Sequence, residues 1–354
     1  MLQFSKRGAD THVTPKAWIL ELSWLNEMLH HFAPFCILIV ALFIDFTFGE
    51  PPWLPRYMPQ LGKLHPVVWV SKLTTMFKTH LRSSNPVLER LNGVLLALTV
   101  TLVFTLPVYF GLGLVLDVLG VLVYVIMAAV VFKITFCIKL ETEWALATAL
   151  AVKEGDLTKG RMYASLFSRR DTQDLTSPQI ISAIIESMAE NLPDFKLSPI
   201  MYCAFLGVPG AVACRTINIL DGTLGFKDPE HIHIGWFSAN LDTITNYIPA
   251  RISMLLIVLA SAILGENYVG AWTNAHQERA KVSSTNHGWP IAAMSGALDI
   301  RLEKTGFYVL GENLEEPTPN HIIRALKIRN AALLLCILFL LPAIFLINLC
   351  GFAF

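Results

Sequence analysis

Charged residues are scarce in this sequence. Only 15% of the 354 residues are Asp, Glu, Lys or Arg, and 54% are apolar, whereas about 25% of an average soluble protein is charged. The 27 basic and 27 acidic side chains cancel, so the chain lacks the net positive field that attracts nucleic acid. We therefore expect an integral membrane protein and no nucleic-acid partner.

Several familiar signatures are also missing. No GxxxxGK[ST], GxSxG or HExxH motif occurs, which excludes a P-loop nucleotide site and two common hydrolase sites. The cysteines form no CxxC pair and lie in or beside apolar stretches, so we expect neither disulfides nor a zinc site. Residues 1–31 lack an apolar core before a cleavage site. We interpret them as a tail with a short amphipathic helix at 15–31, not as a signal peptide.

Long apolar runs are abundant. A spanning helix needs about 20 mostly apolar residues, because the hydrocarbon layer is about 30 Å thick and each helical residue rises about 1.5 Å. The candidates are residues 32–48, 93–110, 118–136, 197–214, 248–264 and 331–354. We predict an all-α integral membrane protein of about five to six transmembrane or re-entrant helices with large helical cytoplasmic loops, in a single polytopic domain over residues 32–354.

Two features refine this topology. Lys and Arg are numerous in residues 49–92, 133–196 and 265–330 but absent from the expected turn at 111–117. The basic segments are therefore predicted to face the cytoplasm and the turn to face outward. Proline and glycine make 197–214 a poor spanning helix, so a broken or re-entrant segment is an open alternative there.

The most informative polar stretch is a predicted helix with Ser177 as its N-cap and Pro178 as its first residue. Glu186 and Glu190 lie four residues apart and share one face of this helix. Their like charges repel unless a cation lies between them, as in a magnesium site. From the spacing alone, a solvated helix face is favoured over a magnesium site.

Other polar groups lie near the borders of apolar segments. Arg169 and Arg170 beside Asp171 offer forked donors for phosphate, but paired arginines at a membrane border are also a plain orientation signal. Ionisable groups at membrane depth usually have a function or a partner. Two groups stand at such borders: Arg215, Asn218 and Asp221, then Asp242, Asn246 and Arg251. For these two groups, a functional site and a structural ion pair are both open interpretations.

These motifs, with several others, occur in one order between residue 45 and about residue 310. They are Asp45 with Gly49-Glu-Pro-Pro52, His65-Pro66, Glu154-Gly-Asp156, 168–172, Glu186-Ser-Met-Ala-Glu-Asn191, Pro209-Gly210, Arg215 to Asp221, Leu241-Asp242, Asn246, Ile248-Pro-Ala-Arg251, Gly288-Trp-Pro290, 292–297 and Arg301-Leu302. In this order they resemble the adenosylcobinamide-phosphate synthase family of cobalamin biosynthesis, known as CbiB or CobD.

The resemblance implies a multi-pass enzyme of the inner membrane. It would join the carboxylate of adenosylcobyric acid to the amine of 1-amino-2-propanol phosphate or a related aminoalcohol, with ATP as co-substrate and Mg²⁺ as cofactor. Its partners would be this corrinoid, the aminoalcohol phosphate and the lipid bilayer, with other late enzymes of the pathway as candidates.

The resemblance also assigns candidate roles within that reaction. Candidate catalytic side chains are Asp171, Glu186, Glu190 and His65. Candidate substrate- and phosphate-binding side chains are Arg169, Arg170, Arg215, Asn218, Arg251, Asn286 and Trp289. Candidate metal ligands are Glu186, Glu190, Asp221 and Asp242. A lone histidine is more often packed or solvated than catalytic, so His65 and, more so, His287 carry little weight alone.

The sequence departs from the family pattern at three places. The usual stretch HPSPNAGWPE reads Val282 to Ile291 here, the usual Asp-Asp pair is Leu241-Asp242-Thr243, and the usual DGV is Asp194-Phe-Lys196. These departures identify a divergent member and leave two alternatives open. One is a membrane signalling protein without ligase activity, like the AmpE branch of the same superfamily. The other is a small-solute transporter, suggested by apolar segments that Pro and Gly break around buried charges, although the absence of an internal repeat disfavours it.

Overall fold

The computed structural model describes residues 15–49, 65–167 and 170–349. Its helices are α1 (Pro15–Phe48), α4 (Pro66–Leu81), α5 (Pro86–Lys133), α6 (Lys139–Lys153), α7 (Leu157–Phe167), α8 (Ser177–Leu192), α9 (Ser198–Leu224), α10 (Trp236–Thr245), α11 (Tyr247–Leu264), α12 (Tyr268–Glu278), α13 (Gly288–Leu298) and α14 (Pro319–Leu349). A π-helical turn, η1 (Pro193–Leu197), joins α8 to α9, and a 3-10 turn, η2 (Arg279–Lys281), follows α12. Two strands, β1 (Leu302–Lys304) and β2 (Tyr308–Leu310), pair as an antiparallel hairpin.

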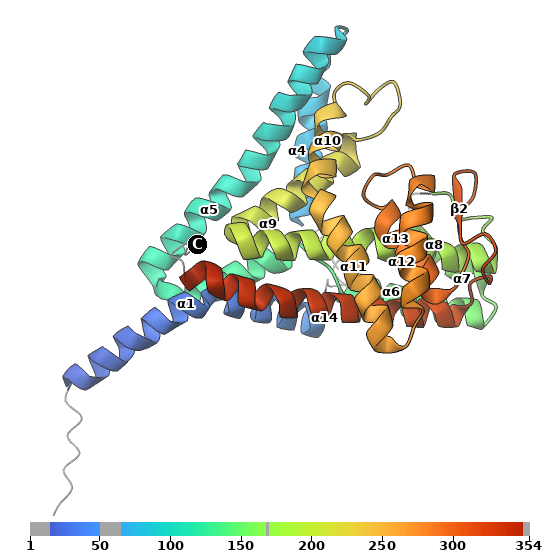
Figure 1. Ribbon diagram of the computed structural model, residues 1–354. Coiled ribbons are helices and arrows are strands. Elements are labelled where there is room, and N and C mark those ends of the chain that lie inside the picture. Colours follow the sequence, from blue (N-terminus) through green and yellow to red (C-terminus); the bar gives the residue numbers. More distant parts are fainter. Residues whose placement is uncertain (1–14, 50–64, 168–169, 350–354) are drawn as a thin grey trace, which may run out of the picture.

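Four helical runs are long and apolar enough to cross a membrane: Pro86–Lys133, Ser177–Leu224, Tyr247–Leu264 and Pro319–Ile344. A shorter apolar helix covers Phe32–Phe48. Leu114, Val118 and Leu122 of α5 are each more than half exposed, which suits contact with lipid. Figure 1 shows α5 as a long diagonal helix at the left of the molecule, with α4 and α10 near its upper end. The prediction of an all-α membrane protein is confirmed.

The prediction of a turn at residues 111–117 is wrong in its position. These residues are helical, and α5 breaks at Gly120, where φ is 79° and ψ is 172°. Glycine adopts this conformation readily, whereas a side chain would clash with the backbone. The first arm of α5 therefore begins at Pro86 and extends well past the predicted end at residue 110.

The helix α9 is broken in the same manner. Gly207 has φ 67° and ψ −174°, and Pro209 follows it inside the helix. Residues 197–214 therefore do not form a straight span, and the broken-helix alternative is the one observed. As a result, the arm of α9 after the break can face the region that α8 lines, as it does at the site described below.

The last helix begins earlier than predicted. α14 starts at Pro319, 12 residues before the expected start at 331, so Arg329 lies within it. This arginine is fully buried, and its guanidinium donates to Glu141 Oε2 at 2.5 Å and to Thr142 Oγ1 at 2.6 Å. Hydropathy alone places an arginine outside a membrane-spanning helix. An ion pair with good geometry, however, offsets much of the free-energy cost of burying its charge.

The other apolar helices match the prediction closely. α11 begins one residue before the expected 248–264. α1 differs in one respect, since it runs unbroken through the predicted boundary between residues 31 and 32.

Near the end of α1, Asp45 is fully buried. Its Oδ1 lies 3.3 Å from Lys133 Nζ, and its Oδ2 accepts the backbone N–H of Lys139 at 3.0 Å. The carboxylate thereby joins the ends of α1 and α5.

The helix α8 runs through the core. Its N-cap is Thr176 and not Ser177, and the Thr176 N–H donates to Gln179 Oε1 at 3.0 Å. Ile180 and Ile184 are fully buried, and Glu186 is only 1% exposed. The favoured interpretation of a solvated helix face is therefore wrong for Glu186.

Close packing of α12 on α13 positions the segment before α13. A Cβ added to Gly296 would lie 2.1 Å from Gly270 O, so the two helices approach at a distance that only glycine permits. The small residues at 292–297 therefore allow close helix packing. The turn that carries Asn286 and His287 is thereby held against the core.

Candidate functional site

Polar side chains from distant parts of the sequence meet in one cavity of about 440 Å³, which we call the polar pocket. Helices α8 and α9, the π-helical turn η1, the turn before α13 and the β1 strand all contribute to its wall. The charged and amide-bearing side chains that line it are Arg170, Glu186, Glu190, Asn191, Asp194, Arg215, Asn218, Asp221, His287 and Lys304. The break at Gly207 lets the second arm of α9 face the same cavity as α8.

Glu186 is held by two cations. Arg170 Nη2 donates to Glu186 Oε1 at 2.6 Å, and Lys304 Nζ lies 3.7 Å from the same oxygen. Burial raises the pKa of the neighbouring Tyr308 hydroxyl above its usual range, and the charges of Glu186 and Glu190 raise it further. Tyr308 is therefore a neutral side chain at neutral pH.

A second carboxylate in the pocket, Asp194, is paired with a histidine. Asp194 Oδ2 lies 2.9 Å from His287 Nε2. Burial lowers the pKa of His287, but Asp194 outweighs that effect and raises the pKa to about 10. His287 is thus a cation at neutral pH. Asp194 Oδ1 is buried and accepts no hydrogen bond within the part of the chain that the structure describes.

Arg215 and Asn218 connect the pocket to α10. Arg215 Nη1 donates to Asn218 Oδ1 at 2.9 Å, and its guanidinium stacks over the Phe195 ring at 4.1 Å. Asn218 Nδ2 lies 3.4 Å from Asp242 Oδ1, which also accepts from Asn246 Nδ2 at 3.0 Å. Burial raises the pKa of Asp242 to about 7, with further contributions from the nearby charges of Asp194 and Asp221. Asp242 thus lies directly behind the pocket wall.

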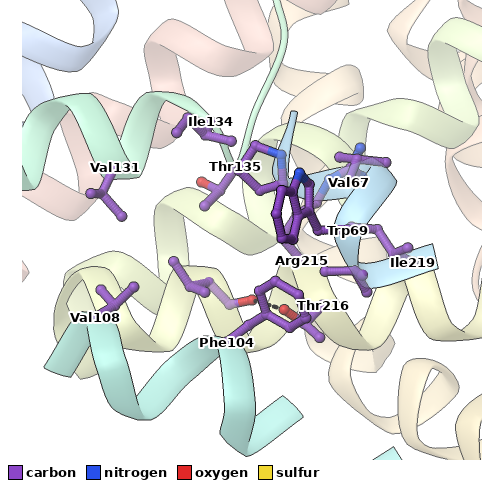
Figure 2. Close-up of a pocket in the computed structure, with 13 residues that line it drawn as sticks. Val67, Trp69, Phe104, Val108, Val131, Ile134, Thr135, Arg215, Thr216 and Ile219 are labelled. Carbon is purple, nitrogen blue, oxygen red and sulfur yellow. Dashed lines mark hydrogen bonds between the residues drawn. The ribbon is translucent and has the colours of Figure 1, made fainter. Parts of the chain in front are cut away.

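An apolar cavity of about 340 Å³ adjoins the polar pocket and shares Val67, Arg215 and Ile219 with it. Figure 2 shows its side chains, which come from α4, both arms of α5 and the second arm of α9. Trp69 and Phe104 supply aromatic surface, and Arg215 is its one charged lining residue among those described. A ligand in the polar pocket could therefore extend an apolar group past Arg215.

Some predicted site residues lie elsewhere. His65 caps α4, because its Nδ1 accepts the Val67 N–H at 3.3 Å. Asp171 is exposed, and its Oδ1 accepts the backbone N–H of Gln173 at 3.0 Å. Neither side chain is among the described residues that line the polar pocket. Arg169 lies outside the described residues.

Arg251, Asn286 and Trp289 form a cluster of their own. Arg251 Nη1 donates to Asn286 Oδ1 at 2.8 Å, and its guanidinium lies 5.5 Å from the Trp289 ring centroid. Asn286 is buried and donates to Thr243 O at 2.9 Å. These contacts tie the turn before α13 to α10 and α11. They place His287, not Asn286 or Trp289, at the polar pocket.

Four of the charged and amide-bearing residues of the pocket were not among the candidates of the sequence analysis: Asn191, Asp194, His287 and Lys304. A signal for Asp194 was present, since it continues the four-residue spacing of Glu186 and Glu190. No local pattern points to His287 or Lys304, because each reaches the pocket only through long-range packing.

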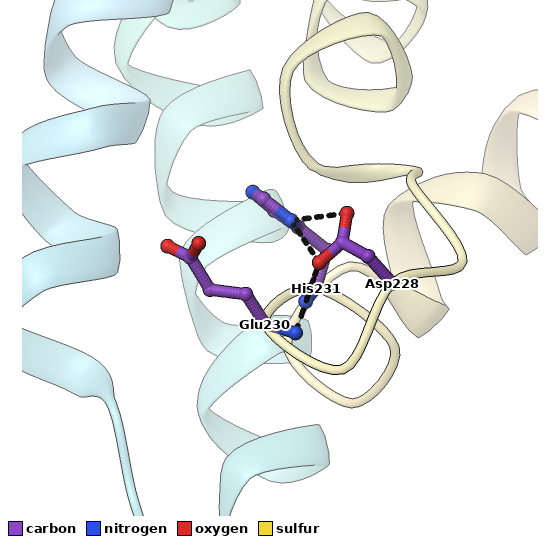
Figure 3. Close-up of side chains that lie close together, drawn as sticks. All are labelled: Asp228, Glu230 and His231. Carbon is purple, nitrogen blue, oxygen red and sulfur yellow. Dashed lines mark hydrogen bonds and ion pairs between the residues drawn. The ribbon is translucent and has the colours of Figure 1, made fainter.

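A cluster of Asp228, Glu230 and His231 has atoms close enough to hold a metal ion. Figure 3 shows the His231 ring bonded to Asp228, with Nδ1 to Oδ1 at 2.8 Å. Lys78 Nζ lies 2.6 Å from Glu230 Oε1 and 2.8 Å from His231 Nε2. Since a lysine ammonium already binds these ligand atoms, the cluster is better described as a bridge from α4 to the loop before α10.

Comparison with known proteins agrees with the resemblance seen in the motifs. The chain matches the family described as CobD/Cbib protein over residues 38–335. It is 35% identical over 299 residues to the probable cobalamin biosynthesis protein CobD of Methanothermobacter thermautotrophicus, covering 84% of this chain and 94% of that protein. It is 36% identical over 307 residues to the protein of the same name from Thermoplasma volcanium, covering 86% and 96%.

A bacterial relative, the cobalamin biosynthesis protein CobD of Dehalococcoides mccartyi, is 31% identical over 296 residues, covering 84% of this chain and 92% of that protein. No solved structure matches the chain. The matched residues 38–335 include both broken helices and every lining residue of the polar pocket. The chain therefore belongs to the CobD/CbiB family.

Proposed function

We propose that this protein is the amide-forming ligase of cobalamin biosynthesis, a multi-pass enzyme of the inner membrane. It joins the carboxylate of adenosylcobyric acid to the amine of 1-amino-2-propanol phosphate or a related aminoalcohol at the expense of ATP. The observation that carries the proposal is the polar pocket, in which the segment before α8, α8 itself, η1, α9, the turn before α13 and β1 bring four cations and four carboxylates together.

The cations of the pocket suit phosphate groups. Arg170 and Arg215 present planar guanidinium groups, which bind phosphate through paired N–H donors. Lys304 of β1 and the protonated His287 of the turn before α13 add two further positive charges. Both the aminoalcohol phosphate and ATP carry phosphate, so several cations are needed in one cavity.

The carboxylates suit Mg²⁺. Glu190, Asp194 and Asp221 line the pocket, and Asp194 Oδ1 is a buried oxygen that lacks a hydrogen-bond donor among the described residues. Mg²⁺ prefers one or two carboxylates together with substrate phosphates. When bound, the ion would supply positive charge to the phosphate oxygens.

The reaction requires activation of a carboxylate, because a carboxylate does not acylate an amine unaided. ATP transfers its γ-phosphoryl group to the corrinoid carboxylate, releasing ADP and giving an acyl phosphate. The amine then attacks the acyl carbon, phosphate leaves, and the amine's proton passes to a base. Arg170 and Arg215 would hold the phosphate groups during both steps, and a pocket carboxylate would accept the proton.

The size of the pocket restricts how the corrinoid binds. A cavity of about 440 Å³ accommodates a small phosphorylated aminoalcohol and the reacting phosphates, since ligand pockets span about 300–1,000 Å³. A corrin ring with its side chains is much larger. In this proposal the ring stays outside and only the arm that carries the carboxylate enters.

Purified protein in detergent should convert adenosylcobyric acid, 1-amino-2-propanol phosphate and ATP into a product with one new amide bond. Mass spectrometry of the corrinoid would detect it, and omission of ATP or Mg²⁺ should abolish it. No product under any condition would favour the signalling protein without ligase activity. Uptake of a solute into vesicles without product would favour the transporter.

A further inference from the structure

The carboxylates around the polar pocket differ in what already binds them. Glu186 Oε1 is engaged by Arg170 at 2.6 Å and lies 3.7 Å from Lys304 Nζ. Asp242 Oδ1 accepts from Asn246 and lies within reach of Asn218. Glu186 Oε2 is also buried without a hydrogen-bond donor among the described residues, but two protein cations already meet the charge of Glu186.

Asp194 is paired with one protein cation, His287, and not with two. Its side chain is only 10% exposed, and it lines the pocket from η1, a π-helical turn. One oxygen, Oδ2, is held by His287 at 2.9 Å. The other oxygen, Oδ1, is buried without a hydrogen-bond donor from the described residues. A buried oxygen left in this way costs free energy unless a ligand binds it.

We infer that Asp194 is the principal protein ligand of a divalent cation in the polar pocket, that His287 orients it, and that Glu186 is not a metal ligand. This deepens the proposed function, on which it rests, by selecting one carboxylate among those that could hold the ion. It revises the earlier assignment of Glu186 as a candidate metal ligand.

The chemistry of hard cations favours this choice. Mg²⁺ and Mn²⁺ take carboxylate oxygens in octahedral geometry, and a neighbour that bonds the second oxygen fixes the ligand's orientation. His287 fulfils that condition for Asp194. Glu190, four residues before Asp194, and Asp221 line the same cavity and supply further negative charge. A cation beside Glu186 would meet two protein cations, Arg170 and Lys304, whereas a cation at Asp194 Oδ1 would meet only His287, which bonds the other oxygen.

The test is a titration of the full-length protein in detergent with Mn²⁺, in the absence of ATP and corrinoid. Electron paramagnetic resonance measures the bound Mn²⁺. Asp194→Asn should weaken Mn²⁺ binding by about tenfold or more, and His287→Gln by about tenfold, as for residues that orient a ligand. Glu186→Gln should change it by less than about twofold. Asp194→Glu, which keeps the charge, should recover part of the affinity.

Two comparisons separate a loss of binding from a loss of fold. His276→Gln changes an exposed histidine of α12 and should leave Mn²⁺ binding unchanged. Each variant should also elute as a monodisperse peak with the parent's unfolding temperature to within a few degrees. Asp194→Ala is the second variant if Asp194→Asn fails to fold.

Three outcomes would overturn the inference. The first is that wild-type protein binds no Mn²⁺ at millimolar concentration. The second is that Glu186→Gln weakens binding as much as Asp194→Asn does. The third is that Asp194→Asn weakens only the binding of the aminoalcohol, which would make Asp194 a partner of the substrate's ammonium group. Mn²⁺ binding with the expected order but no amide product would support the inference and contradict the proposed ligase activity.

Discussion

Two groups of buried charges lie close together in this protein. They differ in whether protein groups bind all the oxygens of their carboxylates. In the first, Glu141 Oε2 receives Lys196 Nζ at 2.8 Å and Arg329 Nη1 at 2.5 Å, while Oε1 accepts from Asn191 at 2.9 Å. Both oxygens of this carboxylate are therefore occupied by the protein. We call Glu141, Lys196 and Arg329 the core triad.

The second group is the polar pocket, reached from the triad through Asn191 and η1. Here Asp194 keeps one buried oxygen without a donor, and Asp242 has a pKa of about 7 because burial and neighbouring carboxylates oppose its charge. In the triad, by contrast, Lys196 and Arg329 outweigh burial and lower the pKa of Glu141. A complete set of partners indicates a structural role, and an incomplete set indicates a place for a ligand.

The largest expected effect breaks the triad. Glu141→Gln leaves Lys196 and Arg329 buried, each at 0% exposure, without their counter-charge. Removing one partner of a buried ion pair costs about 3–5 kcal/mol, so the variant should unfold at a much lower temperature or fail to accumulate. Thermal unfolding in detergent measures this. Glu143→Gln, on an exposed position of the same helix, is the control and should behave like the parent.

The next prediction compares how a pocket residue and a residue of the loop before α8 affect ligase turnover. Glu186→Gln removes the counter-charge of Arg170 and should lower ligase turnover at least tenfold, which corresponds to about 1.4 kcal/mol. Asp171→Asn, at an exposed position outside the lining, should change turnover less than twofold. Both are measured by product formation at saturating substrates. Equal losses would show that the loop closes over the pocket during the reaction.

A smaller effect concerns pH. The folded pKa of His287, about 10, is raised above its ordinary value of 6.5, so its pair with Asp194 stabilises the fold fully below about pH 6.5 and progressively less up to pH 10. The difference in unfolding temperature between wild type and His287→Gln should therefore be largest near pH 6.5 and shrink towards pH 10. A difference that is constant over this range would contradict a charged His287.

The smallest effect concerns the exposed cluster beside α4. Glu230→Gln removes one contact of Lys78, and exposed ion pairs contribute little to stability. It should leave both the unfolding temperature and Mn²⁺ binding near the parent's values. A clear fall in Mn²⁺ affinity would move the candidate metal site from the polar pocket to this cluster.

Sequence patterns predicted the local features well. The apolar run 248–264 is α11 to within one residue, and the Glu186–Glu190 spacing marked the helix that supplies the polar pocket. The pattern failed where a single glycine decides the outcome. Gly111 lies in the predicted turn and Gly120 in a predicted apolar run, yet of the two only Gly120 takes a positive φ.

The sequence by itself determined that this chain is a helical membrane protein, because apolar runs about 20 residues long have no other stable environment. It also determined the family, because many motifs in one order carry that information without any coordinates. Only the tertiary structure decided that Asp171 stays outside the pocket and that Asp194, His287 and Lys304 belong inside it. These residues lie up to 110 positions apart, from 194 to 304. Their meeting depends on helix packing, which hydropathy and spacing do not record.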